Sequence, residues 1–145
     1  MAVTARLYGL FFDSLASKKI DLKTDTLKVM LCTSAYVPNQ DTHQYKSSVT
    51  NEVTGTGYTA GGATLTAVTV TYDAATNKLK LDSADSSWAS STITARYAVF
   101  YDSTPTTDAT RPLISYIDFG TDVVATNETL VIELDANGIA ALTAA

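Results

Sequence analysis

Residues 92–101 read Thr-Ile-Thr-Ala-Arg-Tyr-Ala-Val-Phe-Tyr, the clearest run of alternating side chains in this chain of 145 residues. One face of the run would carry Ile93, Ala95, Tyr97, Val99 and Tyr101. The opposite face would carry Thr94, Arg96, Ala98 and Phe100. Because successive side chains of a β-strand point to opposite faces, this period of two residues predicts a strand.

Further strand patterns follow on the C-terminal side of this run. Residues 113–119 alternate in the same way, and residues 129–134 form the last strong strand pattern. The polar residues 103–110, which include Pro105, predict a loop, and residues 120–127 predict a turn. Asn137-Gly138 predicts a final turn before a short apolar tail at residues 139–142.

On the N-terminal side, the pattern predicts a β-hairpin over residues 65–82, with a turn at 73–77. Residues 83–91 read as a polar turn and a Ser-rich link around Trp88, and another strand is expected at 27–32. Between residues 33 and 62 the chain is irregular and contains four glycines. Irregular segments of this length inside a compact domain are usually functional or flexible.

The first segment of the chain has the spacing of a helix. Its large apolar residues recur at offsets of three and four, which places them on one face: Leu7, Phe11, Phe12 and Leu15. Thr4 is a suitable N-cap residue. We therefore expect a helix at about residues 4–17, and strands from about residue 27 onward.

The composition supports a fold built mainly of strands. Apolar residues make up 46% of the chain and charged residues 17%, and threonine occurs 24 times. Such β-branched residues suit a pleated, half-buried surface. We expect one β-rich domain over residues 1–145, a β-sandwich that is jelly-roll-like or an open barrel, with one N-terminal helix.

Charge and residue counts exclude several kinds of partner. The net charge is −5 and the ten Lys and Arg residues are scattered, so no basic patch for nucleic acid is expected. Cys32 is the only cysteine and His43 the only histidine, so neither an intrachain disulfide nor a closed zinc site is expected. No stretch approaches the roughly 20 apolar residues of a membrane span, so we expect no membrane partner.

No catalytic constellation is recognisable, so we expect neither an enzyme nor a bound cofactor. Asp118 and Glu133 could in principle form a glycosidase carboxylate pair, but strand alternation explains both as outward-facing residues. Residues 55–62 superficially resemble a phosphate loop. They lack the Lys-Ser/Thr and the helix that should follow, so we predict a flexible or tightly turned segment instead.

Aromatic residues in the irregular regions are the candidates for a binding surface. Exposed aromatics on loops serve protein interfaces or sugar binding, although they can also cover the ends of a core, and the sequence leaves both readings open. Together with two polar neighbours they form the predicted interface set: Tyr36, Asn39, Gln40, Tyr45, Tyr58 and Trp88.

Several stretches of the chain resemble a family of small virion proteins from tailed phages and prophages. They are KVMLCTS (28–34), YVPNQDTHQY (36–45), VTNEV (49–53), GTGYTAGG (55–62) and STITARYAV (91–99). The resemblance covers nearly the whole chain and becomes loose from Thr129. It implies a structural protein of the virion that is assembled in the host cytoplasm and needs no cofactor.

Within a virion, we expect a capsid decoration or cement protein, because a short, β-rich and lightly charged chain suits packing against other subunits. The expected partners are other phage structural proteins, above all the major capsid protein, and further copies of this chain. A tail, neck or fibre-associated component is the second hypothesis. A host-surface module that binds glycans through Tyr58 and Trp88 is an alternative of a different class.

Overall fold

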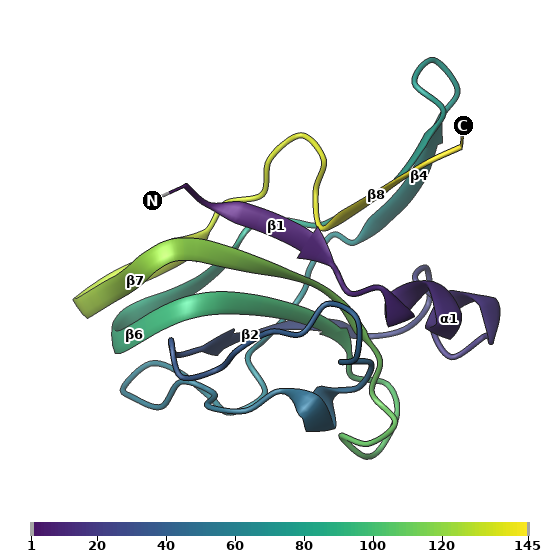
Figure 1. Ribbon diagram of the computed structural model, residues 1–145. Helices are drawn as coiled ribbons and strands as arrows, with labels where there is room; N and C mark the ends of the chain where they lie inside the picture. The colour runs from purple at the N-terminus through teal and green to yellow at the C-terminus, as the bar shows by residue number, and fades with distance from the viewer. Residues whose placement is uncertain (1, 145) are drawn as a thin grey trace.

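The computed structural model describes residues 2–144 and consists mainly of strands in two antiparallel sheets (Figure 1). The strands are β1 (Thr4–Leu7), β2 (Leu27–Cys32), β3 (Ala63–Thr64), β4 (Thr69–Asp73), β5 (Lys78–Asp82), β6 (Ser86–Asp102), β7 (Leu113–Ile132) and β8 (Ala140–Thr143). One α-helix, α1 (Leu10–Ala16), and a short 3-10 helix (Lys46–Ser48) complete the described elements. The prediction of a mainly β fold with one N-terminal helix is confirmed.

The larger sheet has the strand order β1-β7-β6-β2-β3. Its centre is the long hairpin of β6 and β7, which pair from Ser86 opposite Ile132 to Tyr101 opposite Leu113. Strand β2 pairs with the other side of β6, with Leu27 opposite Asp102. The strands predicted at 27–32 and 92–101 are therefore confirmed, and the second of them is longer than expected.

β6 and β7 also include residues for which the sequence predicted a link and a turn. The Ser-rich residues 86–91 belong to β6, and residues 120–127 belong to β7. Pairing is interrupted there by register shifts, and Ser90, Gly120 and Asn127 adopt positive φ angles. Residue types that favour turns also occur at β-bulges, where a strand bends but continues. The predicted turn at 120–127 is therefore wrong, because these residues lie within β7.

The smaller sheet has the strand order β4-β5-β8. The predicted hairpin is confirmed from Thr69 to Asp82, with its turn at residues 74–77. Residues 65–68 do not belong to it, because Ala67 has a positive φ of 51° and the chain bends there. The apolar tail pairs with β5 as β8, with Leu142 opposite Leu79.

The N-terminal helix is shorter than predicted. Residues 4–7 pair as β1 with the edge of β7, Leu7 opposite Ser115, so Thr4 is not an N-cap. The helix begins after Gly9 and buries only Phe11 and Ser14, while Phe12 remains 49% exposed. Edge pairing with β7 supplies hydrogen bonds that the first turn of a helix would lack, and helical spacing alone does not reveal this alternative.

The larger sheet is buried on both faces. On one face, Leu27, Val29 and Leu31 join a core with residues of α1 and of the smaller sheet, among them Phe11, Leu81 and Ala140. A core shared between two antiparallel sheets is compatible with the predicted β-sandwich. The opposite face carries a second cluster, rich in tyrosine: Tyr8, Met30, Cys32, Tyr36, Val99, Tyr101, Leu113 and Tyr116.

Candidate interaction surface

Residues 33–62 form a layer along the larger sheet (Figure 1). Tyr36 and Val49 pack into the tyrosine-rich cluster, whereas Val53 and Tyr58, further along the segment, pack into the core on the other face. Isolated bridges fasten the layer at three places, pairing Glu52 with Cys32, Thr56 with Thr92, and Tyr45 with Pro112. Val53 also donates its backbone N–H to the carbonyl of Leu31 at 2.9 Å. The segment is irregular in secondary structure, but its backbone is tied to the sheet along much of its length.

Tyr36 is the main apolar anchor of this covering layer. Its side chain is 1% exposed, and its ring stacks on that of His43. The hydroxyl oxygen lies 2.9 Å from the Tyr8 hydroxyl and 3.0 Å from Nδ1 of His43. Burial raises the pKa of Tyr36 to about 12, so the phenol stays neutral. Tyr36 is therefore a core residue, and its expected place at an exposed interface is corrected.

Tyr58 and Trp88 pack against each other rather than toward solvent. Their ring centroids lie 6.0 Å apart, and Trp88 is 6% exposed because it lies in β6 and faces the core. The hydroxyl of Tyr58 donates to Oε1 of Glu52 at 2.7 Å and accepts the backbone N–H of Leu31 at 3.0 Å. The alternative reading, in which these aromatics cover the core, describes both residues.

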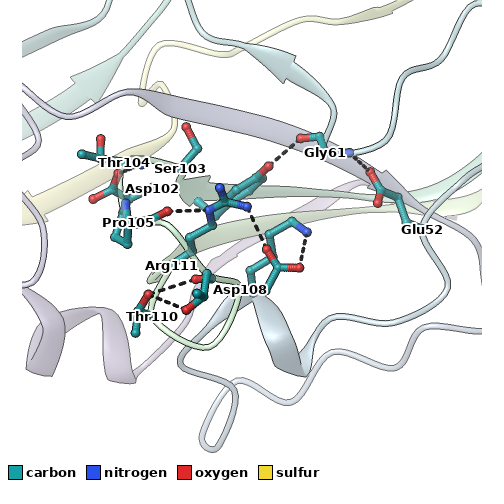
Figure 2. Close-up of polar contacts among 12 residues, drawn as sticks. Glu52, Gly61, Asp102, Ser103, Thr104, Pro105, Asp108, Thr110 and Arg111 are labelled. Carbon is teal, nitrogen blue, oxygen red and sulfur yellow. Dashed lines mark hydrogen bonds and ion pairs between the residues drawn. The ribbon is translucent and has the colours of Figure 1, made fainter.

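The carboxylate of Glu52 also holds the glycine-rich residues 55–62 of the layer (Figure 2). Glu52 Oε1 accepts the backbone N–H of Gly61 at 2.6 Å, and the Tyr101 hydroxyl donates to the Gly61 carbonyl, also at 2.6 Å. Burial raises the pKa of Tyr101 to about 12. Residues 55–62 are thus a tightly turned segment, which was one of the two predicted descriptions.

A charged cluster ties the layer to the loop between β6 and β7. Lys46 Nζ lies 3.0 Å from Asp108 Oδ2, and Arg111 Nη1 lies 2.9 Å from Asp108 Oδ1. Arg111 Nε also donates to the carbonyl of Pro105 at 2.8 Å (Figure 2). The Lys46 ammonium holds the pKa of the Asp108 carboxyl below its usual value. These contacts position two loops against each other.

Three of the six predicted interface residues remain at or near the surface. Asn39 is exposed, but its Oδ1 already accepts the backbone N–H groups of Asp41 and Thr42 at 3.0 and 3.1 Å. Gln40 and Tyr45 are partly buried, and the Tyr45 hydroxyl accepts a hydrogen bond from Lys19 Nζ at 2.8 Å. The structure therefore separates the predicted set into three surface residues and three residues that anchor the layer.

A second surface, missed by the sequence reasoning, lies at the far end of the smaller sheet. All eight residues from 71 to 78 are exposed, and in Figure 1 this end of the β4–β5 hairpin projects away from the rest of the molecule. β4 is an edge strand with no partner on its outer side among residues 2–144. Tyr72 is 56% exposed on it. We call residues 69–78 the arm.

The two carboxylates considered for catalysis are not brought together. Asp118 lies opposite Tyr97, whereas Ile132, next to Glu133, lies opposite Ser86, more than ten strand residues away. A glycosidase pair needs a separation of roughly 5–10 Å. Asp118 instead forms an ion pair with Arg96, whose guanidinium lies 2.7 Å away and lowers the pKa of the carboxyl.

Within the described part of the chain, no three His, Cys, Asp or Glu side chains are grouped so that they could hold a metal ion. No helix between residues 2 and 144 has the length and apolarity needed to cross a membrane.

Comparisons with known proteins returned no family model, no curated protein and no solved structure that matches this chain.

Proposed function

We propose that this chain is a non-catalytic structural subunit that acts by assembling with further copies of itself and with other proteins. The observation that carries the proposal is the arm, which extends a bare strand edge beyond the body of the molecule. Monomeric proteins usually protect such edges with Lys, Pro or a bulge, because a free edge pairs readily with another strand. β4 reads Thr-Val-Thr-Tyr-Asp and contains none of these devices.

The proposed partner of the β4 edge is β4 of a second copy. An antiparallel pair centred on Thr71 would place Val70 opposite Tyr72 and Thr69 opposite Asp73 of the other copy. No like charges meet in this register, and an aromatic side chain opposite a β-branched one is a favourable cross-strand pair. A two-fold contact of this kind is closed, so it produces a dimer rather than a filament.

We place this subunit in the bacteriophage virion, first as a capsid decoration or cement protein beside the major capsid protein. The support for the virion is the resemblance of residues 28–62 and 91–99 to phage virion proteins. A firmly braced sheet with projecting contact elements suits a protein that holds neighbouring subunits together. A tail, neck or fibre-associated position is the second hypothesis. Glycan binding is disfavoured, because the buried ring of Trp88 offers no face for a sugar to stack on.

The experiment is a charge-exchange test at Thr71, measured by sedimentation velocity. Thr71→Lys places two lysines opposite each other at the two-fold axis, and we expect the dimer to weaken about fivefold or more. Thr71→Glu should weaken it similarly, and an equimolar mixture of the two variants should associate again. Ala75→Lys adds the same charge in the exposed turn and should leave association unchanged.

Two results would contradict the proposal. The first is a wild-type chain that stays monomeric up to millimolar concentration. The second is an association that neither Thr71 variant weakens. Either result would show that the arm does not join two copies of the chain. For the virion, cryo-electron microscopy of particles carrying this chain should show it repeated over the capsid surface. Density confined to the tail tip would replace the capsid hypothesis with the second one.

A further inference from the structure

The outer side of β7 has no partner over its C-terminal part. β1 pairs only with residues 115–118, and no other strand among residues 2–144 pairs with that side of β7. Figure 1 shows β7 continuing past the N-terminal end of β1. Within the described chain, the backbone of residues 121–131 is hydrogen-bonded to β6 alone. We call residues 121–131 the β7 edge.

The side chains of the β7 edge are exposed and partly apolar. Only Ala125 and Leu130 are buried, and they belong to the core. Three of the seven large apolar side chains that are exposed in residues 2–144 lie here: Val124 is 61% exposed, Val131 46% and Val123 36%. β-branched side chains pack well against those of a neighbouring strand. The β7 edge is therefore suited to pairing with a further strand.

The charge of the chain is divided unevenly between its two parts. Residues 1–82 contain eight Lys and Arg and seven Asp and Glu, a net charge of +1. Residues 83–145 contain two Arg and eight Asp and Glu, a net charge of −6. The negative charge of the protein therefore comes from the part of the chain that contains β6 and β7.

No basic side chain neutralises the acidic residues of the β7 edge. The two arginines of this part of the chain, Arg96 and Arg111, are already held in ion pairs with other carboxylates. None of the ion pairs among residues 2–144 includes Asp122 or Glu128. Both residues are exposed, so their charge is available to a partner.

This charge determines which kind of strand can pair with the β7 edge. Residues 112–145 contain no Lys or Arg, so two β7 edges from two copies would bring only negative side chains together. Like charges on neighbouring strands are destabilising, whereas opposite charges attract. A strand that carries Lys or Arg is therefore a better partner for the β7 edge than a second copy.

A groove beside the β7 edge offers room for a long side chain. Its volume is about 310 Å³, and its lining includes Val124, Thr126 and Glu52. Glu52 adds a further carboxylate to this region. Because the stem of Lys or Arg is apolar and its head is charged, such a side chain suits a groove with both kinds of lining.

We propose that the β7 edge binds an extended, basic segment of another protein, which joins the larger sheet as a strand beside β7. Backbone hydrogen bonds to the bare edge supply affinity, as in other cases of strand addition. The exposed valines pack against the added strand, and Asp122 and Glu128 select Lys or Arg. The β7 edge is separate from the arm, so this inference does not rest on the proposed pairing of two β4 strands.

The test is a nuclear magnetic resonance titration of the isotope-labelled protein with two end-blocked synthetic peptides, KTVTVTK and ETVTVTE. The lysines of the first are six residues apart, the same separation as between Asp122 and Glu128. We expect the basic peptide to shift the amide signals of residues 121–131 and to bind about tenfold more tightly than the acidic one. Added NaCl should reduce this difference, because salt screens exposed charges.

Charge-reversal variants test the role of the two carboxylates. Asp122→Lys and Glu128→Lys should each weaken the basic peptide about threefold or more and strengthen the acidic one. Asp41→Lys makes the same change at an exposed residue of another loop and should leave both affinities unchanged. Thr71→Lys, which disrupts the proposed β4 pair, should bind the basic peptide like the wild type.

Three outcomes would overturn the proposal. The first is a basic peptide that shifts no amide signal of residues 121–131 at millimolar concentration. The second is equal affinity for the two peptides that neither Asp122→Lys nor Glu128→Lys changes. The third is a set of shifts confined to the arm, which would assign the added strand to β4. Because the peptide and the Thr71 variants probe different strands, failure of this site is distinguishable from failure of the proposed dimer.

Discussion

Replacing Gly62 by alanine should destabilise the fold more than the same change one residue earlier. Gly62 has φ +81°, and a Cβ atom there would overlap the carbonyl oxygen of Val29 and lie 2.7 Å from Cα of Met30. These are backbone atoms of β2, so they cannot rotate away. Gly61 has a similar φ of +92°, but its Cβ would meet only side-chain atoms at ordinary contact distance, the Tyr101 hydroxyl at 3.5 Å and Lys28 Nζ at 3.9 Å. Both substitutions therefore carry the free-energy cost of an alanine at positive φ, but only Gly62→Ala adds a steric overlap with the backbone of β2.

The expected magnitudes follow from this difference. An alanine forced to a positive φ costs about 1–2 kcal/mol, and this applies to both variants. Pushing a packed strand aside adds about 1–3 kcal/mol for Gly62→Ala alone. We expect the variants to differ in free energy of unfolding by this second amount, which corresponds to about 2–4 °C in Tm per kcal/mol.

Urea unfolding followed by the fluorescence of the buried Trp88 measures the difference directly. The midpoint of Gly62→Ala should fall below that of Gly61→Ala with an unchanged m-value. Equal midpoints would show that the layer over β2 can shift without cost. The description of residues 33–62 as a fixed cover would then be refuted.

Two further predictions concern titratable side chains. The Cys32 thiol is 0% exposed, and burial raises its pKa to about 12. A water-soluble disulfide reagent at pH 8 should therefore label Cys32 only as urea unfolds the chain. Rapid labelling of the folded protein would contradict this prediction. The ion pair with Arg96 lowers the pKa of Asp118 in the folded protein. The stability that this pair contributes is therefore fully present above the unfolded-state pKa of about 3.9. It is lost as the pH falls through the lower pKa of the folded state. Thermal unfolding between pH 6 and 2 should therefore show a smaller acid loss for Asp118→Asn than for wild type, and equal slopes would count against the pairing.

Local sequence patterns were sufficient to predict strands and turns where each residue's environment follows from its neighbours in the sequence. Alternation over residues 27–32 and 92–101 predicted two central strands, because a period of two places every second side chain on one face of a sheet. The turn between β4 and β5 was equally visible in its polar residues. These features depend on the chain near the element and not on what packs against it.

Tertiary contacts determined the features that alternation does not encode. Residues 4–7 have helical spacing but pair with β7, and Gly120 bends that strand without ending it. Both outcomes depend on a partner strand that is distant in sequence. The same holds for the candidate surface, since Tyr36 and Trp88 have loop-like neighbours but point into the core.

The sequence by itself determined the class of the fold and the approximate strand positions, because those follow from side-chain period and composition. It did not determine which aromatic residues are exposed or where the free strand edge lies. These properties arise only when segments far apart along the chain come together. Burial and strand pairing are properties of that packing, and no local pattern of residues specifies them.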